Sequence, residues 1–274
     1  MFLLTLNNFD IILIGGYMKI KKYRKLKDNR YIIFFDDDLE VKIYDDVIVK
    51  YNLLVKKEIS NDEYNELLEY NNSLEAYYKT LKYITRKIRT EKEIIKYLEK
   101  DFDRDIINKV IVKLKNEKYL NDDLYIKCYV SDKLNLSNDG PNKIKRDLIA
   151  LGMKEESIQP YLNDIDDEVW LKKIQLIINK RIKCNHQYGM NKLKEKIVYD
   201  LSNLGYYKWM IENVITNSEF RNDDSLIEKE YNKWYKKLSS KYASNDLLFR
   251  IRNKLLCKGF TYDEIDNFLQ NKKN

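Results

Sequence analysis

One pattern of apolar residues recurs around three glycines, and this recurrence constrains the fold more than any other feature. Gly152, Gly205 and Gly259 each follow a Leu by four residues and an Ile by eight, and each precedes an Ile by six. A fourth copy lies upstream around Asp101, with Phe102 and Ile107 in the corresponding places. Successive anchors are 51, 53 and 54 residues apart. A period of this length indicates tandem repeats that stack on their neighbours.

The apolar spacing within one copy predicts three helices. Residues eight and four before the anchor form one stripe of a helix, and Gly at the anchor lets the chain leave that helix in the left-handed conformation. The Ile six residues after the anchor opens a second helix, and a longer amphipathic segment such as 169–182 or 226–238 supplies a third. The chain is therefore expected to be mainly α, with tandem three-helix repeats forming an elongated, curved array.

A small N-terminal module is expected to precede the repeats. Apolar side chains alternate at Leu39, Val41 and Ile43, which predicts a strand, and three aspartates at 36–38 predict a solvated hairpin turn before it. Short helices are expected near 46–51 and 61–70. The predicted divisions are an extension over 1–17, which is disordered or comes from a start codon upstream of Met18, a β-hairpin and helix module over 18–73, and repeats over 74–120, 121–165, 166–222 and 223–274.

The charge is unevenly distributed. Of the formal net charge of +7, residues 1–73 carry −2 and residues 74–274 carry +9. A basic excess of this size fits an anionic partner, although many proteins with neutral partners share it. Three widely spaced cysteines indicate a reducing cytoplasm. The interrupted apolar start at residues 1–17 is too short for a clean membrane span, so no membrane association is expected.

Nothing in the sequence predicts catalysis. His186 is the single histidine, and Cys184 beside it is a weak metal pair without further partners. Neither glycine-rich phosphate-binding motif is present. We therefore expect no enzyme activity, no metal and no cofactor.

Several segments in a fixed order resemble one known family. Arg89-Thr90 opens the first repeat, and Tyr119-Leu-Asn-Asp122, Gly140-Pro141 and Lys258-Gly-Phe-Thr-Tyr-Asp-Glu-Ile265 follow. Their order and spacing resemble the RecX family of bacterial recombination regulators over about residues 18–274. Asp101 and Lys118 depart from the family pattern, which often has Gly at both places.

The resemblance implies a cytoplasmic regulator of the recombinase RecA. Members of the family bind RecA, lie along the groove of the filament that RecA forms on single-stranded DNA, and modulate its ATPase and strand exchange. Many members inhibit RecA, and some bind free DNA directly. The expected partners are RecA and the single-stranded DNA within its filament, with free DNA as a further candidate, and the chain is expected to act as a monomer.

Basic residues recur on the corresponding helix of every copy, and these are the predicted filament- and DNA-binding residues. We call this set the basic stripe, and its members are Arg86, Lys87, Arg89, Lys92, Lys143, Lys145, Arg146, Lys192, Lys194, Lys196, Arg250, Arg252 and Lys254. Cations near a helix N-terminus oppose the helix dipole, so their recurrence there favours a binding role over a folding role. A solvated lysine-rich face that only aids solubility is the competing interpretation.

Two other functions stay open on the sequence alone. A stand-alone helical DNA-binding protein of helix-turn-helix type would bind DNA equally well without RecA. A general protein scaffold would show no salt-sensitive DNA binding.

Overall fold

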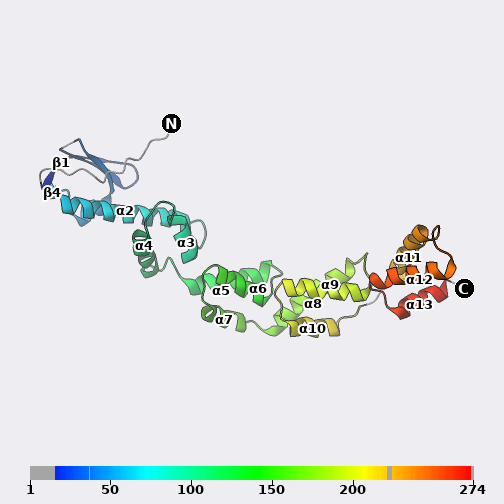
Figure 1. Cartoon of the computed structure of the whole chain (residues 1–274). Coiled ribbons are helices and arrows are strands. Elements are labelled where there is room, and N and C mark those ends of the chain that lie inside the picture. Colours follow the sequence, from blue (N-terminus) through cyan, green and yellow to red (C-terminus); the bar gives the residue numbers. More distant parts are fainter. Residues whose placement is uncertain (1–15, 37, 221–223, 273–274) are drawn as a thin grey trace. The chain divides into compact units, whose positions relative to one another are not determined.

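The computed structural model describes residues 16–272, apart from residue 37 and residues 221–223. The described chain is mainly helical, with a small antiparallel sheet near its N-terminal end (Figure 1). It forms two compact units that divide between Asn121 and Asp122. The expected fold class, helices in groups of three after a small β module, is confirmed.

The first unit opens with a four-stranded antiparallel sheet. Its strands are β1 (Tyr17–Lys25), β2 (Arg30–Phe35), β3 (Glu40–Tyr44) and β4 (Glu58–Ser60), in the order β3-β2-β1-β4. The predicted hairpin is the β2–β3 pair, where the Phe35 amide donates to the Leu39 carbonyl at 2.9 Å. Asp36 and Asp38 are exposed in its turn, and Asp37 lies outside the described residues.

The sheet also takes in one residue that the sequence assigned to the extension. Tyr17 is the first residue of β1 and pairs with Ser60 of β4, whereas residues 1–15 lie outside the described residues. Strand β4 has only three residues, and the alternation of apolar side chains gave no signal for so short an element.

Helix α1 (Asp45–Lys50) follows strand β3 as expected, but α2 (Asn61–Ile84) is one long helix where the sequence predicted a short helix near 61–70 and a separate repeat from residue 74. The start of α2 is fixed by a capping box, in which the side chain of Ser60 accepts a hydrogen bond from the Glu63 backbone amide and the side chain of Glu63 accepts one from the Ser60 backbone amide. Leu67 and Leu74 pack into the core under the sheet, while Ala76 and Tyr77 pack against the next two helices. The expected boundary between residues 73 and 74 therefore falls inside α2. No Gly or Pro interrupts 61–84, so the two apolar stripes join in phase.

Helices α3 (Glu91–Leu98) and α4 (Arg104–Asn116) complete the first group of three with the second half of α2. The turn between them differs from the expectation. Asp101 does not adopt a positive φ, because its amide and that of Phe102 both bond back to the Leu98 carbonyl at 3.0 and 3.1 Å. The left-handed residue in this unit's last turn is instead Lys118, with a φ of 62°.

The second unit holds three further groups of helices (Figure 1). Their bounds are α5 (Asp122–Leu136), α6 (Pro141–Ala150) and α7 (Glu155–Asn163), then α8 (Asp167–Lys183), α9 (Met190–Asn203) and α10 (Lys208–Asn217), then α11 (Asp224–Leu238), α12 (Ser244–Cys257) and α13 (Tyr262–Asn271). The first two of these groups share one continuous core, in which Trp170 is the largest fully buried side chain, whereas α11–α13 have a core of their own. Gly152, Gly205 and Gly259 have φ values of 97°, 85° and 95°, as the repeat pattern predicted.

Successive groups in the second unit are joined through backbone atoms. The Gly140 amide, just before α6, donates to the Leu204 carbonyl at 2.6 Å, and the Asn142 amide donates to the Gly205 carbonyl at 3.0 Å. The next junction repeats this arrangement. There the Gly189 amide donates to Lys258 at 2.8 Å, and the Asn191 amide donates to Gly259 at 3.2 Å. The start of the middle helix in one group thus binds the glycine turn of the following group.

The two glycines at each junction are required because the backbones touch. A Cβ atom on Gly140 would lie 2.6 Å from the Tyr206 nitrogen, and one on Gly205 would lie 2.4 Å from the Lys143 nitrogen. Neither distance leaves room for a carbon atom, and the obstacle is backbone that cannot rotate away. The recurrent glycine therefore serves two purposes, a left-handed helix end and a close approach between groups.

Replacing Gly140 with Ala tests this junction without disturbing the local backbone. Gly140 has a φ of −88°, which alanine adopts freely, so any destabilisation comes from the clash with Gly205 and Tyr206. We expect the free energy of unfolding to fall by about 1–3 kcal/mol in urea titrations. Gly16→Ala is the matched control, since nothing lies within 4 Å of a Cβ there. Equal stability of the two variants would contradict the junction.

Candidate partner-binding surface

The structure places the basic stripe on four helices or their approaches, but not at equivalent positions. Lys143 and Lys192 are each the third residue of their helix and lie against the following glycine turn. In α12 the third residue is Asp246, and Arg250, Arg252 and Lys254 lie further along the helix. Arg250, Arg252 and Lys254 therefore lie on the expected helix, but not near its N-terminus. Helix α6 has 10 residues and α12 has 14. Residues at the same number of positions before the glycine turn therefore lie at different distances from the start of their helix.

In the first group, only Lys92 lies within α3, while Arg86, Lys87 and Arg89 precede it. Arg89 is tied down. Its Nη1 lies 3.0 Å from Glu93 Oε1, and its guanidinium sits 4.3 Å above the Tyr83 ring, which in turn stacks on Tyr97 at 4.1 Å. Arg89 therefore joins the end of α2 to α3, and its contacts are those of a structural residue.

The basic residues of α6 differ in how firmly they are held. Lys143 forms an ion pair with Asp139 at 2.5 Å, and Lys145 forms one with Glu155 at 2.5 Å that ties α6 to α7. Arg146 is exposed on the same helix. Among the described residues, Arg146 makes no ion pair or hydrogen bond.

The basic residues of α9 and α12 also have internal contacts. Lys192 pairs with Glu195 at 2.7 Å, Arg250 pairs with Asp246 at 3.1 Å, and Arg252 pairs with Asp266. The remaining members lie over aromatic rings, namely Lys194 over Phe220, Lys196 over Tyr188 and Lys254 over Trp234, at 4.7–5.2 Å. Exposed pairs of this kind contribute little stability, so a stronger anion can displace them. In the described structure, Arg86, Lys87 and Arg146 could meet an anion without giving up such a contact.

A buried carboxylate at the junction was missed by the sequence analysis. The Asp139 side chain is 8% exposed and accepts hydrogen bonds from Lys133 at 2.6 Å and Lys143 at 2.5 Å. Burial raises its pKa, but the two ammonium groups outweigh this and hold the pKa of Asp139 below its usual value. The only signal in the sequence was an Asp directly before Gly140-Pro141.

Lys173 is a second missed residue at this junction. Its ammonium group donates hydrogen bonds to the carbonyls of Leu134 and Ser137 at 2.6 and 2.8 Å. Lys173 lies on α8 of the next group, and the two carbonyls lie at the C-terminal end of α5, where backbone carbonyls have no partner within the helix. Burial lowers the pKa of Lys173. The Lys173 side chain therefore adds to the backbone contact between these two groups.

The described residues contain no group of three or more His, Cys, Asp or Glu side chains that could hold a metal ion. Cys128, Cys184 and Cys257 are free thiols. Within the same described part of the chain, no helix is both long enough and apolar enough to cross a membrane.

Comparison with known proteins identifies the family to which the chain belongs. Residues 76–114, which span the second half of α2 through α4, match the family model for the first three-helix domain of RecX. The regulatory protein RecX of Streptococcus agalactiae serotype III (strain NEM316) is 35% identical over 92% of this chain and 99% of its own length. The chain belongs to the RecX family. RecX of Lactococcus lactis subsp. cremoris (strain MG1363) is 29% identical over 93% of this chain and 97% of its own length.

Solved RecX structures share the fold. One crystal structure of regulatory protein RecX aligns with a TM-score of 0.66 and 22% identity over 73% of this chain and 99% of that chain. RecX from Lactobacillus salivarius aligns with a TM-score of 0.50 and 25% identity over 53% of this chain and 96% of that chain. The grouping of helices in threes is thus a RecX arrangement.

Replacing Asp139 with Asn should weaken the junction in a pH-dependent way. Because folding lowers the Asp139 pKa, the carboxylate stabilises the native state above the unfolded value of 3.8 and loses this effect as the pH falls through the folded value. At pH 7 the variant should lose about 1–3 kcal/mol of unfolding free energy.

The difference between native protein and Asp139→Asn should shrink as the pH drops below about 4. Urea titrations at several pH values measure it. Asp164→Asn, at the exposed C-terminal end of α7, is the control and should not lower the stability at any pH, because a carboxylate there opposes the helix dipole. A difference that stays constant down to pH 2 would contradict the role of the ionised carboxylate.

Proposed function

We propose that this chain binds RecA and the filament of RecA on single-stranded DNA, and modulates the recombinase, with inhibition as the direction, without catalysis. The observation that carries the proposal is the 35% identity to a regulatory protein RecX over nearly the whole of both chains. The proposal places the protein in the cytoplasm, acting as a monomer. Its three free thiols suit a reducing compartment.

The geometry supports a partner that itself repeats. At two successive junctions the middle helix and the following glycine turn border a hollow. One hollow, of about 340 Å³, is lined by Asn142, Arg146 and Gly205, among others. Its counterpart, of about 560 Å³, is lined by Asn191, Glu195 and Gly259, among others. Equivalent hollows at successive groups suit equivalent features on successive subunits of a filament.

The exposed groups around these hollows are of the kind found in protein interfaces. Ile149 and Tyr262 are 42% and 65% exposed, and Arg146 adds a cation beside Ile149. Aromatic and arginine side chains contribute most to association when a partner covers them. The basic stripe residues Arg86, Lys87 and Arg146 supply the charge for DNA phosphate or for acidic side chains of RecA.

The direct experiment is co-sedimentation of the protein with RecA filaments on single-stranded DNA, together with the DNA-dependent ATPase of RecA. We expect co-sedimentation at substoichiometric protein and a lowered ATPase rate. Absence of both effects would refute the proposal. Equal binding to DNA with and without RecA would favour the stand-alone DNA-binding alternative instead.

The same assay over a salt series measures the ionic part of the contact. We expect the logarithm of the binding constant to fall linearly with the logarithm of the salt concentration, with a slope that grows by about 0.7–0.9 for each phosphate contacted. Binding that does not change between low and high salt would exclude a phosphate-contacting basic stripe.

Reversing the charge of Lys145 and Arg146 together should weaken filament binding while the helical circular dichroism stays intact. Because Lys145 also holds Glu155, Arg146→Glu alone separates the binding effect from the loss of that ion pair. We expect about a fivefold loss of affinity from Arg146→Glu, as is usual for a charge at the edge of an interface. Lys172→Glu with Lys208→Glu is the matched control on exposed lysines of α8 and α10. Equal losses in both sets would show that only net charge matters.

A further inference from the structure

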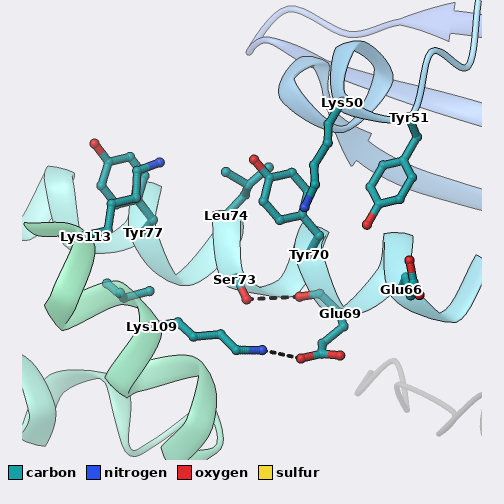
Figure 2. Close-up of a pocket in the computed structure, with 11 residues that line it drawn as sticks. Lys50, Tyr51, Glu66, Glu69, Tyr70, Ser73, Leu74, Tyr77, Lys109 and Lys113 are labelled. Atoms are coloured by element: carbon teal, nitrogen blue, oxygen red, sulfur yellow. Dashed lines mark hydrogen bonds and ion pairs between the residues drawn. The ribbon is translucent and has the colours of Figure 1, made fainter. Parts of the chain in front are cut away.

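A pocket in the first unit lies apart from the basic stripe. It has a volume of about 400 Å³ and is formed by the end of α1, one face of α2 and the facing side of α4 (Figure 2). Volumes of this size suit small ligands or a single protruding group. Its floor is apolar, at Leu74 and Val110, and its walls carry tyrosines and lysines.

The tyrosine rings form the flat part of the wall. Tyr51 and Tyr70 lie edge to face with ring centroids 6.2 Å apart, and Tyr77 lies further along α2. Burial raises the pKa of Tyr51 and of Tyr70, so both hydroxyls keep their protons at neutral pH and can donate hydrogen bonds. Flat rings with hydroxyl donors at their edges suit a planar polar ligand.

Ammonium groups border this aromatic wall on two sides. The Lys50 Nζ lies 3.5 Å from the centroid of Tyr70, and the Lys113 Nζ lies 3.8 Å from that of Tyr77 (Figure 2). Both lysines are exposed, so each is held in place mainly by the ring beneath it. A phosphate entering beside Lys50 or Lys113 would attract that ammonium group and leave the ring face beneath it open for stacking.

Two carboxylates narrow the choice of ligand. Glu69 is paired with Lys109, whereas Glu66 is exposed at the rim (Figure 2). The carboxylates of an acidic peptide offer neither a flat ring to cover the tyrosines nor an N–H group that Glu66 could accept. A nucleobase has both a ring and N–H groups that a carboxylate accepts, and its phosphate suits the lysines.

We propose that this pocket binds one nucleotide unit, with the base against Tyr70 and the phosphate held by one of the lysines that border the rings, Lys50 or Lys113. The unit can come from a free nucleotide or from single-stranded DNA. Stacking on an aromatic ring is tolerant of base identity, so no preference for one base is expected. The site does not depend on the proposed action on RecA, since it is tested with no RecA present.

Binding to the full chain is measured by calorimetry with three probes: thymidine monophosphate, a short oligothymidylate, and an abasic strand of the same length. The oligothymidylate should bind about tenfold more tightly than the abasic strand, because only the former has bases to stack. Saturable binding of the monophosphate would identify a free nucleotide as the source, and binding of the strand alone would identify DNA. Equal affinity for the abasic strand would overturn the proposal.

Variants then locate the site. Tyr70→Leu should abolish the preference for bases over the abasic strand, and Lys50→Gln with Lys113→Gln should weaken both strands about tenfold or more. Lys96→Gln, exposed on α3 outside the pocket, is the matched control and should change neither. If all three variants behave alike, the pocket is not the site.

Cross-linking of the unaltered protein guards against a variant that fails to fold. An oligonucleotide carrying iodouracil should cross-link under ultraviolet light to peptides containing Tyr51, Tyr70 or Tyr77. Cross-links confined to other segments would contradict the assignment, whatever the variants show.

Discussion

The close approach of backbone to backbone at Gly140 and Gly189 governs the second unit. An amide at the start of one helix meets a carbonyl in the glycine turn of the next group at both junctions. This contact leaves no room for a Cβ atom on the glycine of either chain segment at the junction. It therefore fixes how neighbouring groups meet. At the first junction Lys173 adds a side-chain contact between the two groups, and Asp139 holds Lys133 and Lys143 together beside it. The hollows beside the glycine turns, and the cations that border them, take their positions from this contact.

The repeat could be read from the sequence because its cause is local. A helix end that needs a positive φ selects glycine, and the apolar stripe before it has the helical period, so Gly152, Gly205 and Gly259 were informative. The expectation for Asp101 was wrong because this turn closes by two amides that share the Leu98 carbonyl. Such a turn does not require a positive φ at Asp101. The short strand β4 depends on its pairing with β1, which no local pattern records, whereas the continuity of α2 is consistent with the absence of Gly and Pro over 61–84.

The basic stripe was the least predictable feature, because a cation's partner is set by the fold. Arg89 and Arg146 look equivalent in the sequence, yet Arg89 is clamped by Glu93 and Tyr83 while Arg146 faces solvent. Counting lysines along a helix does not distinguish a neutralised charge from an available one. The same holds for Asp139, which an ordinary surface interpretation would place in water.

Helix α2 links the sheet, the nucleotide-sized pocket and the segment that matches the RecX model. It has 24 residues, so it extends for about 36 Å as one rod. A shortened chain that began at residue 74 would lack the capping box and expose a bare helix end in the middle of an apolar stripe. The β module is therefore no detachable appendage, and the natural place to separate this protein into fragments is after Asn121.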